Sequence, residues 1–265
     1  MRFEQNRDRG DLNQSIKNDQ EALDLRPDGH PDRPTLLFNL AAGLLARFED
    51  RSDLDQSIEC NREALNLRPE GHLSRSTLLS NLAGSLQMHF KQTGDRCDVD
   101  QSIKIGQEAL DLRPSGQTDR PASLTNLAIC LWAQFEQTKD WSDLDKSIKH
   151  DKEALDLWPV GHKSRSTSLS NLAGSLRMRF RWTSDISDLD LSIKYDREAL
   201  SLRPKGHPDR SASLSTLGMG LHMRFKQTES KSDLVSSLCL AQAGAVHESS
   251  PVANRLRAAL QWIKI

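Results

Sequence analysis

The tripeptide Glu-Ala-Leu occurs five times in this chain at nearly regular spacing, and this recurrence constrains the fold more than any other feature. Its copies lie 42 or 45 residues apart and begin at Glu21, Glu63, Glu108, Glu153 and Glu198. A proline follows six residues after each Glu, at Pro27, Pro69, Pro114, Pro159 and Pro204. Self-similarity with a fixed period of about 20 to 50 residues is typical of stacked-repeat proteins. The sequence therefore predicts an array of units of about 45 residues.

A second recurring tripeptide, Asn-Leu-Ala, marks the other half of each unit. Its copies begin at Asn39, Asn81, Asn126 and Asn171, with a degenerate Thr216-Leu217-Gly218 in the fifth place. In the second unit the apolar residues around it are Leu79, Leu82, Ala83, Leu86 and Phe90. This spacing of three and four residues places them on one face of a helix.

The segment that contains Glu-Ala-Leu is predicted to be a helix as well. Asp53 is a good N-cap residue for it, with Gln56 closing a capping box. The same acid recurs at Asp11, Asp98, Asp143, Asp188 and Asp233. Pro69 ends this helix, and the next helix is expected to begin near Arg75. Short loops require neighbouring helices to pack antiparallel. We therefore predict an all-α fold, an α-solenoid with a right-handed superhelix of antiparallel helix pairs.

Composition narrows the function classes. Of 265 residues, 36% are hydrophobic and 28% charged, with a formal net charge of −1, which argues against a nucleic-acid partner. No run approaches the roughly 20 apolar residues that cross a bilayer, so no membrane partner is expected. The four cysteines have no CxxC spacing and are expected to be free thiols in a cytoplasmic protein.

These features resemble the tetratricopeptide repeat (TPR) in the longer form found in kinesin light chains. Leu82 and Ala83 match the first helix of that repeat, while Ser57, Ala64 and Pro69 match the second. The chain departs from the pattern three residues before the last Ala, where the family has an aromatic residue. That position holds Asp19, Asn61, Gly106, Asp151 and Asp196, so we expect different packing there.

The strings Asp-Leu-Asp, Gly-His-Pro-Asp-Arg and Arg-Phe-x-Gln-Thr look like fungal TPR proteins in which the array often precedes a CHAT peptidase domain. The His and Cys motifs of such a peptidase do not occur in this sequence. We therefore assign residues 1–250 to the array and residues 251–265 to a C-terminal capping or connecting helix, as the resemblance implies.

The beginning of the chain aligns with the end of a repeat helix, because Met1-Arg2-Phe3 matches Met178-Arg179-Phe180. We therefore expect a new helix at Asp11–Arg26, an apolar face on it that is under-covered, and a natural gene product that starts upstream.

The recurring Asn is the sharpest functional candidate. In peptide-binding members of the family the matching Asn hydrogen-bonds an extended ligand in the concave groove, and one Asn side chain offers both a donor and an acceptor. The alternative is that Asn39, Asn81, Asn126 and Asn171 brace the stack. Helical phase adds further groove candidates, whose alternative is core packing or a solvated rim. These are Gln87, Trp132, Arg177, His222, Arg179 and Arg224.

Histidines and arginines recur after the turn glycine. His30, His72, His162 and His207 lie in different units, so we expect them to stabilise turns and to bind no metal. The arginines that follow are expected to pair with an Asp at an adjacent helix start. They are Arg33, Arg75, Arg120, Arg165 and Arg210.

No catalytic or cofactor-binding motif is present in the sequence, so we predict neither an enzyme nor a cofactor. The leading interpretation is a non-catalytic scaffold that binds a peptide or a partner helix on its concave face. A regulatory segment of a larger CHAT-type protease is the alternative. Helical-repeat RNA binding needs side chains that vary between units, and the repeated Asn argues against it.

Overall fold

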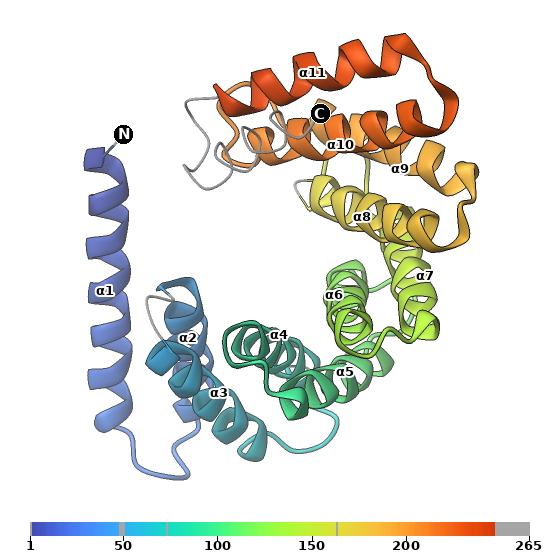
Figure 1. The fold of residues 1–265 in the computed structure, drawn as a ribbon. Helices are drawn as coiled ribbons and strands as arrows, with labels where there is room; N and C mark the ends of the chain where they lie inside the picture. Colours follow the sequence, from blue (N-terminus) through green and yellow to red (C-terminus); the bar gives the residue numbers. More distant parts are fainter. Residues whose placement is uncertain (1, 48–50, 73, 163, 247–265) are drawn as a thin grey trace. The chain divides into compact units, whose positions relative to one another are not determined.

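The structure is a computed structural model that describes residues 2–47, 51–72, 74–162 and 164–246. Within these ranges the chain forms α-helices joined by short loops, with no β-strand (Figure 1). The predicted all-α solenoid of helix pairs is confirmed. The chain divides into two compact units, an N-terminal unit of Met1–Lys139 and a C-terminal unit of Asp140–Ile265.

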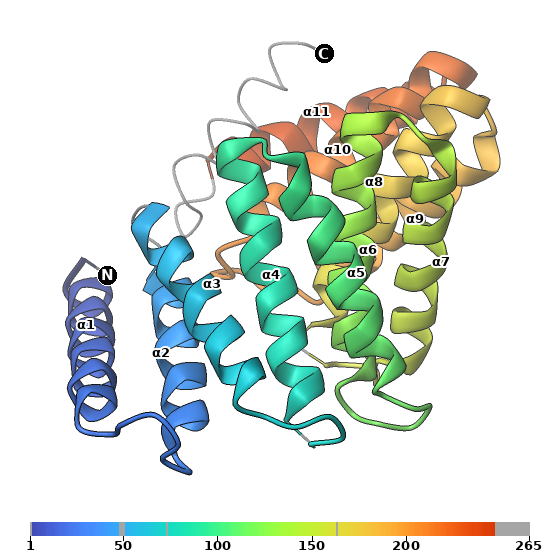
Figure 2. The same cartoon turned by 90° about the horizontal axis from the view of Figure 1, so that it is seen from below.

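Six helices lie in the described part of the N-terminal unit. They are α1 (Arg2–Asp24), α2 (Arg33–Arg47), α3 (Arg51–Asn66), α4 (Arg75–Thr93), α5 (Arg96–Asp111) and α6 (Arg120–Thr138). Each helix packs against the next one along the chain, and α4 also contacts both α2 and α6 (Figures 1 and 2). The Asn-Leu-Ala helices α2, α4 and α6 therefore form one side of this unit.

The C-terminal unit repeats the same arrangement. Its described helices are α7 (Trp141–Leu157), α8 (Arg165–Thr183), α9 (Ile186–Ser201), α10 (Arg210–Thr228) and α11 (Lys231–Ala245). Successive helices pack in order from α7 to α11. The predicted helix at 251–265 lies outside the described residues.

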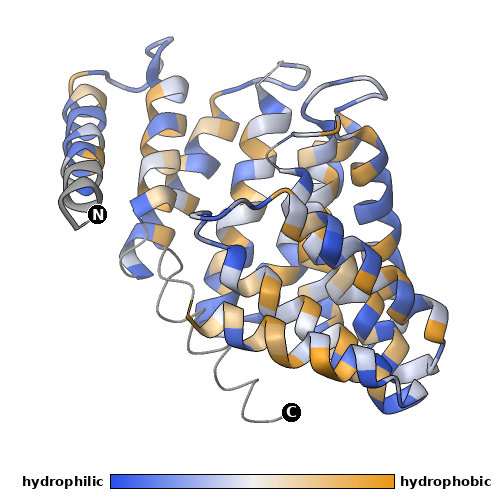
Figure 3. Cartoon of the chain, turned by 90° about the horizontal axis from the view of Figure 1, so that it is seen from above, coloured by the Kyte–Doolittle hydropathy of each residue, from blue (hydrophilic) through white to orange (hydrophobic). Residues whose placement is uncertain are grey.

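The apolar stripes read from the sequence form the core. In α2, Leu37, Leu40 and Leu44 are at most 1% exposed, and they pack with Leu82 and Leu86 of α4 in one cluster. Burying a leucine side chain contributes roughly 1.5–3 kcal/mol. Figure 3 shows apolar and polar residues alternating around each helix, as a stack of amphipathic helices requires.

The predicted N-caps are wrong by three residues. The N-caps of α5, α7 and α9 are Asp95, Asp140 and Asp185, whose carboxylates accept the N–H of the residue two positions later. The predicted acids, Asp98, Asp143 and Asp188, lie inside the first helical turn. Each of these three helices begins with two acids three residues apart, and the apolar stripe starts only after the second one. The pattern therefore favoured the wrong member of the pair.

The predicted helix start at Asp11 is also wrong, because α1 is continuous from Arg2 to Asp24. Its apolar side is not left bare where the structure describes it. Ile16 and Leu23 are 8% and 7% exposed and belong to the cluster that α2 and α4 share.

The position where the TPR pattern has an aromatic residue is buried and mostly polar. Asn61 and Asp196 are each 1% exposed, and Asp151 is equally buried. Burial raises the pKa of Asp151 well above its usual value. The side chains that replace the aromatic residue are therefore accommodated inside the helix stack at Asn61, Asp151 and Asp196.

Candidate peptide-binding face

The recurring histidines stabilise the turns, as expected. Nδ1 of His30, His72, His162 and His207 accepts a hydrogen bond from the backbone N–H two residues later, at 3.1–3.2 Å. A neutral imidazole that accepts at Nδ1 carries its proton on Nε2. No group of three or more His, Cys, Asp or Glu side chains within the described ranges is placed to hold a metal ion.

The arginine after each histidine ties three segments together. Arg165 donates through Nη1 to the carbonyl oxygens of Leu155 and Trp158, at 2.8 and 3.1 Å, which satisfies the end of α7. Its Nε also donates to Glu198 of α9 at 3.0 Å. Equivalent pairs join Arg33 to Glu63 and Arg75 to Glu108. For these three arginines the predicted Asp at a helix start is wrong, because the acid is the Glu of the next Glu-Ala-Leu.

Two predicted groove cations, Arg179 and Arg224, are held by acids of the fold. Arg179 binds both carboxylate oxygens of Asp188 at 2.7 Å and donates to Asp145 at 3.1 Å. Arg224 binds Asp233 and Asp190 in the same way. These hydrogen bonds raise the pKa of both guanidinium groups. Each arginine therefore joins two acids from different helices, and both cations are already neutralised.

Arg177 and Gln87, also predicted for the groove, lie in the interior at 8% and 6% exposure. Arg177 pairs with Asp196 of α9 and donates to Ser192 at 3.1 Å. Burial raises the pKa of Asp196 to about 6, while Arg177 opposes that shift. Gln87 Nε2 is buried and has no hydrogen-bond partner among the described residues.

Trp132 on α6 and His222 on α10 are half-buried. The His222 ring lies 6.1 Å from that of Phe225, and burial, with a smaller effect from Lys226, lowers its pKa. Of these two, only Trp132 lies on the same helix as a member of the Asn row.

The four asparagines of the Asn row differ in their exposure. Asn39 on α2 and Asn126 on α6 are exposed, while Asn81 on α4 and Asn171 on α8 are half-buried. Within the part of the chain that the structure describes, none of the four side chains makes a hydrogen bond. The side-chain Nδ2 of Asn171 is buried without a partner. In the N-terminal unit three of these asparagines lie on the contacting helices α2, α4 and α6.

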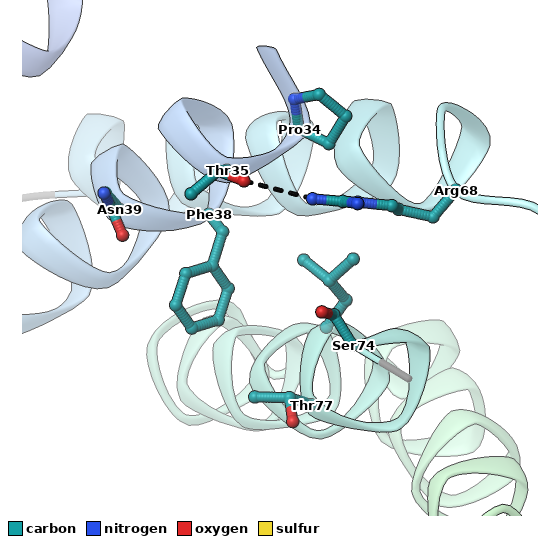
Figure 4. A pocket seen from close by; sticks show the side chains of 8 residues that line it. Pro34, Thr35, Phe38, Asn39, Arg68, Ser74 and Thr77 are labelled. Carbon is teal, nitrogen blue, oxygen red and sulfur yellow. Dashed lines mark hydrogen bonds between the residues drawn. The ribbon is translucent and has the colours of Figure 1, made fainter. Parts of the chain in front are cut away.

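A cleft of about 260 Å³ lies beside Asn39, between α2 and α4 (Figure 4). Its lining residues are Pro34, Thr35, Phe38, Asn39, Arg68, Ser74, Thr77 and Leu78. The Phe38 ring points from α2 toward α4, and Arg68 extends to Thr35, to which it donates at 3.0 Å (Figure 4). None of the eight lining residues is acidic.

The sequence reasoning missed this cleft except for Asn39. The predicted groove residues follow the Asn on its helix. The cleft instead contains residues of α2 that precede Asn39, together with Arg68 and the beginning of α4. The signal was present in the recurring arginine one residue before the helix-ending proline, at Arg26, Arg68, Arg113 and Arg203.

Comparison with solved structures places the fold. A kinesin-light-chain-type protein of nearly identical TPR-like repeats from Podospora anserina superimposes with a TM-score of 0.58 at 16% identity, covering 82% of this chain and 99% of that one. BtubC (BKLC) from P. vanneervenii gives a TM-score of 0.55 at 15% identity, covering 90% and 91%. No protein-family model and no curated protein sequence matches the chain.

The chain therefore has the fold of a TPR-like array of helical repeats. Among the helices that the structure describes, none combines the length and apolar character that a membrane span needs.

Proposed function

We propose that this protein is an interaction scaffold that binds an extended peptide segment of a partner protein across α2, α4 and α6. The observation that carries the proposal is the Asn row of the N-terminal unit. Asn39 and Asn126 are exposed and Asn81 is half-buried, and within the described residues none of the three has an internal hydrogen bond.

An extended peptide presents backbone N–H and C=O groups that need partners when they leave water. Each asparagine amide can donate to one and accept from the other. Successive asparagines on neighbouring helices thus offer a row of hydrogen-bonding groups for the peptide backbone. The sequence preference of the site is then set by the residues around the asparagines. Such preference would come from features like Trp132 and the α2–α4 cleft.

The arginines at 177, 179 and 224 are left out of this proposed site. Asp196, Asp188 and Asp233 already neutralise them. An acidic ligand would have to displace these internal acids, and breaking a buried pair is strongly destabilising.

The test begins with a peptide selected from a random display library on the full chain. Its affinity is then measured by isothermal titration calorimetry for the wild type and for the double variant Asn81→Ala/Asn126→Ala. Loss of two to four hydrogen bonds should weaken binding by about 10-fold or more. Asn66→Ala, an exposed asparagine at the end of α3, serves as the matched control. Unchanged affinity in the double variant would refute the proposal.

A further inference from the structure

The cleft between α2 and α4 contains an arginine with more donors than acceptors around it. Arg68 Nη2 donates to Thr35 Oγ1 at 3.0 Å. Its Nε is buried and has no hydrogen-bond partner in the described part of the chain. Its Nη1 lies 2.7 Å from His72 Nε2.

The contact between Arg68 and His72 brings two donors together. His72 Nδ1 accepts the backbone N–H of Ser74 at 3.1 Å, as the equivalent histidines do in their own turns. The imidazole proton therefore resides on Nε2, which faces a guanidinium N–H. His72 Nε2 therefore does not serve Arg68 as a hydrogen-bond acceptor.

The next pair of helices in the same unit provides a matched comparison. Arg113 holds the position of Arg68 and donates to the hydroxyl groups of Thr77 at 3.1 Å, of Ser80 at 3.0 Å and of Ser123. These three acceptors come from α4 and α6. Arg113 is only 3% exposed, and its donors are turned inward.

At Arg68 two of these three hydroxyl groups are missing. Thr35 is equivalent to Thr77, but Phe38 replaces Ser80 and Leu78 replaces Ser123. Phe38 and Leu78 both line the cleft of about 260 Å³ that opens beside Arg68. The replacement of two serines by apolar residues therefore leaves the guanidinium with one hydroxyl acceptor, that of Thr35, and next to an open space.

We propose that this cleft binds the phosphoryl group of a phosphothreonine or phosphoserine in the peptide that the scaffold holds. The inference rests on the proposed function, because the peptide backbone would run along the Asn row beside Asn39. The cleft supplies the Arg68 guanidinium and the hydroxyl groups of Thr35, Ser74 and Thr77. A phosphoryl group carries three acceptor oxygens and pairs well with arginine.

Two further features favour this group over a carboxylate. A carboxylate has only two oxygens, whereas the guanidinium and hydroxyl donors in the cleft come from four side chains. Ser74 is the N-cap of α4, and its hydroxyl makes no capping hydrogen bond. It therefore remains free to donate at the positive end of a 19-residue helix. Phe38 and Leu78 provide an apolar wall for the methyl group of phosphothreonine.

The experiment is an NMR titration of the full chain with three capped amino acids. The probes are the N-acetyl, N-methylamide forms of phosphothreonine, threonine and aspartate. We expect a saturable shift of the Arg68 Nε–H resonance with phosphothreonine and none with threonine. The affinity for the aspartate probe should be lower by about tenfold or more, which is the effect of losing one hydrogen bond to a charged group.

Three variants sharpen the assignment. Arg68→Gln removes the cation and should abolish the saturable shift. Phe38→Ser restores the acceptor that Ser80 gives Arg113, and should weaken phosphothreonine binding roughly tenfold while Arg68 remains. The Phe38→Ser variant tests the same site if Arg68→Gln does not fold. Arg62→Gln, at an exposed arginine of α3, should bind as the wild type does.

The inference is overturned if the wild type shows no saturable shift, if the aspartate probe binds equally well, or if Phe38→Ser binds unchanged. The capped probe spans one residue and does not need the Asn row. Failure of the probe in a protein whose selected peptide still depends on Asn81 and Asn126 thus overturns this inference alone. Probe binding in a protein whose asparagine variants keep full peptide affinity supports the phosphoryl site and overturns the proposed function alone.

Discussion

The α4–α5 pair of the N-terminal unit and the α8–α9 pair of the C-terminal unit occupy equivalent places in the repeat but fill their interiors differently. In the first pair the two buried positions hold Gln87 and Gly106. In the second they hold Arg177 and Asp196, which form an ion pair. The same backbone arrangement thus accommodates either a neutral or a charged interior.

The neutral interior and the charged interior have different energetic costs. Glycine inside a helix costs about 1 kcal/mol relative to alanine, but it lets Leu127 pack close, 3.4 Å from where a Cβ would lie. The ion pair requires burying two charges, which is repaid only while both partners are present. Additional hydrogen bonds from Arg177 to Ser192 and from Thr216 to Asp196 support it. The C-terminal unit should therefore be sensitive to single changes and tolerant of the matched double change.

The largest expected effect comes from breaking that pair. Arg177→Gln should destabilise the C-terminal unit by about 3–5 kcal/mol, because Asp196 stays buried without its partner. The double variant Arg177→Gln/Asp196→Gly, which installs the residues of the N-terminal unit, should recover most of this loss. Urea unfolding of the wild type, both single variants and the double variant gives the coupling energy. Additive losses would contradict the comparison.

The pH dependence of the same pair is the next test. The pKa of Asp196 is raised to about 6 in the fold from a usual value of 3.8, mainly by burial. The folded protein therefore holds this proton more tightly than the unfolded chain does. The resulting stabilisation is complete below pH 3.8 and is lost as the pH rises through 6. With about 1.4 kcal/mol per pKa unit, the change is at most about 3 kcal/mol.

The measurement is the unfolding free energy of the wild type minus that of the double variant between pH 4 and 7. This difference removes groups that titrate equally in both proteins, such as Asp233, whose pKa is lowered by Arg224. The difference should fall as the pH rises. A difference that stays constant or increases with pH would show that Arg177, rather than burial, determines the pKa of Asp196.

The arginines that join successive repeats allow a third comparison between the units. Arg165 donates twice to Glu198, at 3.0 and 2.9 Å, and once to each of two carbonyls. Arg75 reaches Glu108 only at 3.4 Å. Arg165→Gln should therefore cost about 2 kcal/mol and Arg75→Gln about 1 kcal/mol. Chemical unfolding of both variants checks the order, and an equal or reversed order would count against the geometric argument.

The fold could be predicted from the sequence because helices such as α2 and α4 carry the same apolar stripe in every repeat. Such stripes are buried when successive helices stack antiparallel. The site could be predicted only in part. Asn39 stands out in the sequence because it recurs, while Arg68 does not, because the acceptors around it depend on what replaces Ser80 and Ser123 in the neighbouring helices. Arg179 looked like a ligand-binding cation, since the sequence does not show that Asp188 and Asp145 converge on it.

The smallest expected effect concerns the helix ends that follow α4 and α8. Gly94 and Ser184 hold equivalent C-cap positions, with φ of 72° and 58°, and both donate their N–H to a phenylalanine carbonyl at 2.8 Å. The left-handed conformation is free of steric cost for glycine and costs about 1 kcal/mol or more for other residues. Ser184→Gly should therefore stabilise the C-terminal unit by about 1 kcal/mol, and Gly94→Ser should destabilise the N-terminal unit by a similar amount. Thermal unfolding followed by circular dichroism measures both changes. If the two substitutions shift stability in the same direction, the equivalence of the two helix ends does not hold, because a conformational cost must reverse its sign when the residues are exchanged.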